Sequence, residues 1–250
     1  HATAVLLRVR NTVKQKPVRA SSSLSVKLWL HGIGDGRPNR VALFRFKTKD
    51  YDVYLPQDFK KTDMSAVSAL IEAAPLATLV THTAHGLRAD HIPVMMIKDM
   101  LIGHIALAND LHQILDANQD VLAVFSGENA YISPNWYPSK ADTHAVVPTW
   151  NYEVVHVHGR ISFSHDRKSK LAVVGLLTKV LETRTNGDAA WRMADMPADF
   201  MEEKLNGIVA FDIHPTRILG KSKLSQNKSD ADRLGAAQAL EPSLIAAQMK

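Results

Sequence analysis

The stretch LATLVTHTAHGLRADHIPVMMIKDMLIGHIAL, residues 76–107, decides the fold. It contains three apolar segments rich in β-forming residues, separated only by the turns Ala84-His85-Gly86 and Lys98-Asp99. Runs of this kind bounded by short turns are typical of β-strands. We expect strands at residues 76–81, 87–96 and 101–107.

Helices are predicted on both sides of this tract. Asp63 can cap a helix that runs to about Ala74, where Pro75 ends it, and Asp166 begins an amphipathic helix. The chain after Ser229 is Ala-rich and has helical character. Further elements are expected as helices at 111–118 and 199–205 and as strands at 121–125, 152–163 and 208–213. Closely spaced strands with helices mostly at the ends predict a mainly β fold with peripheral helices, an antiparallel barrel.

The composition fits a folded chain with ample core. The chain has 250 residues, and no apolar run approaches the roughly 20 residues that a membrane-spanning helix requires. It has no cysteine, which excludes disulfides, thiolate metal sites and a cysteine nucleophile. A cytoplasmic location is the default expectation for such a chain.

The positive charge is concentrated at the N-terminus. Residues 1–50 hold 11 Lys/Arg and 2 Asp/Glu, net +9, so the other 200 residues hold 30 − 11 = 19 basic and 25 − 2 = 23 acidic ones, net −4. We expect residues 1–52 to be a basic leader, disordered or non-native, and residues 53–250 to form a single domain. Translated upstream sequence is the interpretation we favour; a transit peptide and a basic tail that contacts nucleic acid are the alternatives.

Two stretches of residues 53–250, which we call the body, indicate a ligand-binding site. YISPNWYPSKADTHAVVPTWNY, residues 131–152, holds five of the nine Trp and Tyr residues, and GKSKLSQN, residues 220–227, offers lysines, hydroxyls and amides. Stiff aromatic surfaces suit a planar ligand, and the second string suits an anionic one. The alternative is that the aromatic segment only caps a β core.

Several other chemistries find little support. The twelve histidines show no HExxH helix and no two-His-one-carboxylate spacing, so we expect no metal site. Gly220-Lys221-Ser222 resembles the end of a phosphate-binding loop, but Pro215 stands where that motif requires glycine. The nucleophile motif GxSxG is absent.

The body resembles the FMN-binding split-barrel proteins typified by the transcriptional regulator PaiB. The matching strings span about residues 53–240 in order: YLPQDF at Tyr54, LATLVT at Leu76, ADHIP at Ala89, GHIALAN at Gly103, YISPNWYPSK at Tyr131, VPTWNYEVVHVHG at Val147, WRMADMPADF at Trp191 and GKSKLSQN at Gly220. The resemblance implies a split β-barrel homodimer with FMN at the dimer interface. By that analogy the FMN site comprises His91, His104, Asn109, Trp150, Asn151, Tyr152, Lys221, Lys223, Ser225 and Gln226. Asp90 stands where the family pattern suggests a neutral amide.

The resemblance also implies negative transcriptional regulation. The sequence shows no helix-turn-helix, and the acidic body does not support broad DNA contact. A flavin-dependent oxidoreductase or flavin reductase using NAD(P)H is the alternative function, because the cofactor itself carries redox chemistry in such enzymes.

Overall fold

The computed structural model describes residues 53–250, together with two strands before them, β1 (Ser23–Trp29) and β2 (Val41–Lys47). The chain divides into two units, His1–Tyr54 and Leu55–Lys250. In the first, β1 and β2 pair antiparallel. The other residues of the predicted leader lie outside the described part of the chain, and its interpretation stays a prediction.

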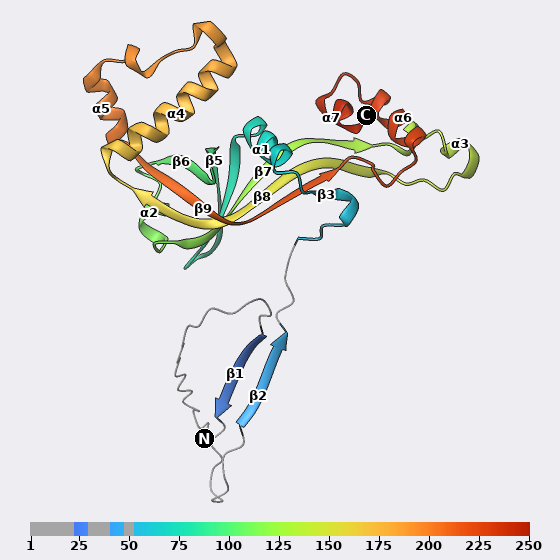
Figure 1. Cartoon of the computed structure of the whole chain (residues 1–250), viewed down its shortest axis with the longest axis horizontal. Helices are drawn as coiled ribbons and strands as arrows, with labels where there is room; N and C mark the ends of the chain where they lie inside the picture. The colour runs from blue at the N-terminus through green and yellow to red at the C-terminus, as the bar shows by residue number, and fades with distance from the viewer. Residues whose placement is uncertain (1–22, 30–40, 48–52) are drawn as a thin grey trace, which may run out of the picture. The chain divides into compact units, whose positions relative to one another are not determined.

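The second unit alternates long strands with peripheral helices (Figure 1). Its strands are β3 (Lys60–Lys61), β4 (Leu76–Thr83), β5 (Gly86–Ile97), β6 (Met100–Ala106), β7 (Gln119–Ile132), β8 (Thr149–Ser164) and β9 (Ile208–Lys223). Its helices are α1 (Met64–Ala73), α2 (Leu111–Ile114), α3 (Lys140–Thr143), α4 (Arg167–Asn186), α5 (Ala198–Asn206), α6 (Asp230–Ala239) and α7 (Leu244–Met249).

The strands close into an antiparallel barrel. Their order is β3-β9-β6-β5-β4-β7-β8, and β8 also pairs with β9, which joins the two sides of the sheet. Fully buried side chains fill the interior, among them Leu79, Leu101, Phe125, Ile161 and Phe211. The predicted mainly β barrel is confirmed, and its interior is a packed core.

The helices cover separate parts of the barrel. The Asp63 carboxylate accepts a hydrogen bond from the Ser65 N–H at 2.9 Å and begins α1, while Asp166 caps α4 through the Ser169 N–H at 2.8 Å. Helix α4 packs through Val173 and Leu177 against β6 and β9. Helices α6 and α7 cover a second apolar cluster at the opposite end from α4 and α5 (Figure 1).

Three predicted elements differ clearly in length from those observed. The strand expected at 121–125 is part of β7, which continues to Ile132. The last strand was expected at residues 208–213, but β9 continues to Lys223 because β8 pairs with it from Ser164 to Tyr152. Gly220 to Lys223 are therefore strand residues. The helix expected at 111–118 ends at Ile114, where Leu115 adopts an extended conformation. No described helix has the length and apolar character needed to span a membrane.

Candidate functional site

Buried side chains fill the barrel interior, so a ligand of this sheet would lie on its outer surface. Five paired residues cross it on adjacent strands: His91 of β5, Thr78 of β4, Val124 of β7, His156 of β8 and Leu219 of β9. Residues paired directly across neighbouring strands share a face of the sheet. None of the five is buried. Together they form an outward row of two histidines, a hydroxyl and two apolar side chains.

This outer face continues along β8 and β9 as an aromatic and cationic surface. Alternation places Tyr152 and Trp150 on the same side as His156. Trp150 is 51% exposed, meets Tyr131 edge to face with ring centroids 6.1 Å apart, and donates from Nε1 to Asn129 Oδ1 at 3.0 Å. We call Tyr131, Trp150, Tyr152, Lys221 and Lys223 the aromatic–lysine face.

Both lysines of this face lie against its aromatic residues. The Lys221 ammonium is 5.3 Å from the centre of the Tyr152 ring, a cation–π distance. Lys223 Nζ donates to Thr149 Oγ1 at 2.5 Å and to the Trp150 carbonyl at 2.9 Å. An ammonium has three donors, so the third N–H of Lys223 can serve an anion. The face therefore offers ring surface and positive charge side by side.

Asn151, Ser225 and Gln226, which the resemblance assigned to the FMN site, do not lie on this face. Asn151 is fully buried and donates to Ser225 Oγ at 2.9 Å, inside the cluster beneath α6 and α7. Gln226 closes its own turn, accepting from the Leu224 N–H and donating to the Ser222 carbonyl, both at 2.7 Å. In this structure these side chains make contacts that hold the end of β9 in place.

Asn109 belongs to a polar network around Arg88. Its Oδ1 accepts from Arg88 Nη2 at 3.1 Å and from the Leu111 N–H at 3.0 Å, while its Nδ2 donates to Asp90 Oδ1 at 3.0 Å. The hydrogen bonds from Arg88 to Asp90 and to Asp110 raise the pKa of the guanidinium. An acidic residue at position 90 is therefore the ion-pair partner of Arg88, at 2.9 Å.

Burial favours the neutral form of two histidines, His104 and His156. His104 lies on β6 beside Ala210, and its Nδ1 is buried with no hydrogen-bond partner among the described residues. Burial lowers the pKa of His104. Burial also lowers the pKa of His156, with smaller contributions from His158 and Lys221. At neutral pH each ring can therefore donate through one nitrogen and accept through the other.

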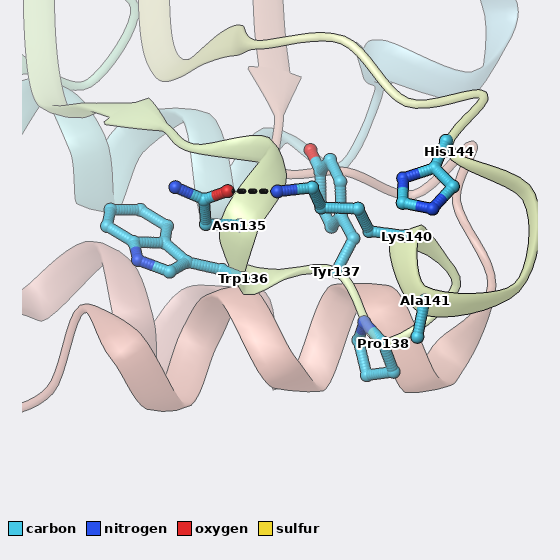
Figure 2. Close-up of a pocket in the computed structure, with 7 residues that line it drawn as sticks. All are labelled: Asn135, Trp136, Tyr137, Pro138, Lys140, Ala141 and His144. Atoms are coloured by element: carbon cyan, nitrogen blue, oxygen red, sulfur yellow. Dashed lines mark hydrogen bonds between the residues drawn. The ribbon is translucent and has the colours of Figure 1, made fainter.

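The segment between β7 and β8 forms a separate pocket of about 390 Å³. Figure 2 shows Lys140 reaching toward Asn135, to which its ammonium donates at 2.5 Å, with the His144 ring facing the same space. Trp136 and Tyr137 belong to this pocket, and Tyr137 is buried in the second apolar cluster. The predicted aromatic segment is thus divided: these two aromatics pack at the loop, and the other three form the aromatic–lysine face.

Asp232 of α6 holds this loop in place. Its carboxylate accepts from the Ser139 N–H at 3.0 Å and from Ser139 Oγ at 2.8 Å. These hydrogen bonds, acting against burial, leave the pKa of Asp232 below its usual value. At Gly235, one turn along, a Cβ would lie 2.5 Å from the Trp136 carbonyl, which shows how closely α6 approaches the loop.

We expect Asp232→Asn to lower the melting temperature at pH 7 and to speed amide exchange between residues 134 and 143. A lowered folded-state pKa gives stability that is present above the unfolded pKa of 3.8 and is lost as pH falls through the folded value. The difference between wild type and variant should therefore shrink below about pH 4. Thermal melts across pH 2–7 check this, and a difference that grows toward low pH would contradict it.

Sequence reasoning missed several buried polar groups, and one of them is Glu153. It points to the inner side of β8, is 4% exposed, and pairs with Lys61 Nζ at 2.7 Å. The signal was available, because Asn151 and Glu153 are polar residues at the positions of β8 where Val155 and Val157 are core. Among the described residues no group of three or more His, Asp or Glu side chains could hold a metal ion.

Comparison with known proteins gives the family. Residues 53–217 match the family model described as "Putative FMN-binding domain". The protease synthase and sporulation protein PAI 2 of Bacillus subtilis is 30% identical over 193 residues, covering 76% of this chain and 89% of the relative. The uncharacterized protein YKL070W of Saccharomyces cerevisiae is 32% identical over 142 residues, covering 48% of this chain and 83% of the relative.

Solved structures show the same fold at low identity. The flavocytochrome Anf3 from Azotobacter vinelandii superposes with a TM-score of 0.52 at 16% identity, covering 74% of this chain and 76% of that one. An FAD- and haem-binding protein from Mycobacterium smegmatis gives a TM-score of 0.52 at 15% identity, covering 69% and 78%. By its family match and its relative in B. subtilis, this chain belongs to the PaiB-like family of FMN-binding split-barrel proteins, and FMN is its cofactor.

Proposed function

We propose that this chain is a homodimeric, cytoplasmic, FMN-dependent regulator of the PaiB type, with FMN bound on the outer face of the barrel. The observation that carries the location is the filled interior beside an open outer face of aromatic rings, lysines and histidines. The domain that binds FMN is residues 53–250.

The residues present fit such a cofactor. FMN joins a planar ring system to a terminal phosphate, and when bound it supplies reversible electron and hydride transfer. Trp150 and Tyr152 offer ring surface, and Lys221 and Lys223 offer charge for the phosphate. The unpaired Nδ1 of His104 also needs a polar partner, which a ligand or an ordered water would supply.

The position of this face supports a dimer. A ligand on the convex outside of a barrel is covered on one side only, whereas small-molecule sites bury most of their ligand. Apolar side chains stand exposed on the strands of this surface, with Leu87 79% and Leu76 59% exposed. A second copy of the chain packed against these strands would cover both the apolar side chains and the flavin.

The regulatory role rests on the relative in B. subtilis, whose name refers to protease synthesis and sporulation. Residues 51–250 carry net −4, so this acidic body does not favour non-specific DNA contact. We therefore propose that FMN binding by the body modulates regulation, with any DNA contact made through a local patch or through the basic residues 1–50.

The purified 250-residue chain and residues 53–250 should be compared in four assays. We expect both to show a bound-flavin absorption spectrum on addition of FMN, and both to run as dimers in light scattering. Salt-sensitive retention of DNA upstream of candidate target genes by the FMN-loaded full chain would support the regulator. Rapid FMN-dependent NAD(P)H oxidation without DNA retention would support the oxidoreductase instead, and a chain that ignores FMN would overturn the proposed site.

A further inference from the structure

A second cavity, away from the aromatic–lysine face, lies between α1 and α7. It is a groove of about 750 Å³. Both helices contact β7, and Figure 1 shows where α1, α7 and β7 lie in the fold. The register of β7 shifts between Ser126 and Asn129, so the strand bulges at the groove. None of the ten residues predicted to bind FMN lines it.

Small residues on α1 give this groove its width. Ala66, Ala69 and Ala73 recur at helical spacing and present one wall, and Leu244 of α7 stands at the other end. A larger side chain on that face of α1 would occupy the groove. The wall is therefore apolar and open, which suits a short hydrocarbon chain.

One polar side chain at this groove is only half satisfied. Glu153 Oε1 accepts both from Lys61 Nζ at 2.7 Å and from Ser222 Oγ at 2.8 Å. No described residue donates to the other carboxylate oxygen, Oε2. The side-chain atoms that are both fully enclosed and without a partner do not include it. Glu153 is 4% exposed and is one of the residues that line the groove, so a ligand in the groove would lie beside its carboxylate.

The charge around the groove selects the kind of donor that Oε2 would accept. Of the described ionisable residues that line it, Lys61 contributes +1 and Glu128 and Glu153 contribute −2, net −1. A carboxylate oxygen without a protein donor can accept a hydrogen bond from a ligand, and a net negative site prefers a cationic donor. We propose that this groove binds a small alkylammonium ligand, with its ammonium on Glu153 Oε2 and Glu128 and its apolar chain along the alanines of α1.

Calorimetric titration of the full-length chain, with and without FMN, tests this site with n-butylammonium, butan-1-ol and butyrate as probes. We expect saturable binding of n-butylammonium and much weaker binding of the other two. Glu153→Gln should weaken n-butylammonium binding about tenfold or more, since charge-assisted hydrogen bonds are the strong ones. The exposed Glu128→Gln should cost a fewfold loss.

Two further variants keep the test decisive if Glu153→Gln disturbs the fold. Ala73→Leu fills the groove without touching either carboxylate and should abolish binding, whereas Ala172→Leu, the same change on an exposed position of α4, should leave it unchanged. Equal affinity for butan-1-ol and n-butylammonium, or full binding by Ala73→Leu, would overturn the proposal. FMN binding by Ala73→Leu should be unaffected, which separates this site from the flavin site.

Discussion

Replacing Trp150 by Ala and Lys223 by Ala, one at a time, should each weaken FMN binding about tenfold or more while leaving the protein folded. Trp150 lies half exposed on β8 and contributes ring surface, and aromatic pairs stabilise a complex beyond the area they bury. Lys223 has a donor left after its bonds to Thr149 and the Trp150 carbonyl, and a hydrogen bond to a phosphate is strong because both partners are charged. Flavin fluorescence titration measures both affinities, and circular dichroism confirms folding.

Two control variants show whether the loss of FMN affinity comes from the lost ring and the lost charge at this face. Trp150→Phe keeps a ring but loses the indole N–H that Asn129 accepts, so it should retain most of the affinity if stacking matters. Lys179→Ala removes an equal charge from an exposed position of α4 and should have no effect. If Trp150→Ala and Lys223→Ala both bind FMN like wild type, the aromatic–lysine face is not the flavin site.

The strands of the barrel could be predicted from the sequence because each one is indicated by a pattern of residues that are close together in the chain. The segments at 76–81, 87–96 and 101–107 have short turns between them. The first two predicted strands lie within observed ones, and the third matches β6 except at residue 107. The same holds for the caps at Asp63 and Asp166, whose carboxylates accept bonds from residues two or three positions away. Such features depend on neighbours in the chain, which a single sequence displays.

The arrangement of the site could be predicted only in part, because it depends on distant pairings. The register of β8 on β9 brings Tyr152 opposite Lys223, 71 positions along the chain, and no local pattern reveals that register. For the same reason Asn151 and Tyr152, adjacent in sequence, have different surroundings: one is buried among α7 residues and the other faces outward. Alternation along a strand determines which of two neighbours can reach a ligand, once the strand's inner face is known.

We expect Gly159→Ala, at the point where β8 pairs with β9, to destabilise the fold by about 3 kcal/mol. Gly159 is buried on β8 where the pairing with β9 shifts register. A Cβ there would lie 2.6 Å from the His214 carbonyl oxygen and 2.6 Å from Ile213 Cγ2. The nearest obstacle is backbone of the paired strand, so relief requires β8 and β9 to separate where they close the barrel.

The same substitution elsewhere should have the opposite sign. Gly175 lies within α4, and a Cβ there would meet only Met193 Sδ at 3.8 Å, an ordinary contact. Gly175→Ala should therefore stabilise the protein by about 0.5–1 kcal/mol through helix propensity. Urea unfolding of both variants measures the two effects on one scale. If Gly159→Ala is as stable as wild type, β8 and β9 do not approach each other as closely as in this structure. The register of β8 on β9, and with it the position of the aromatic–lysine face, would then be wrong.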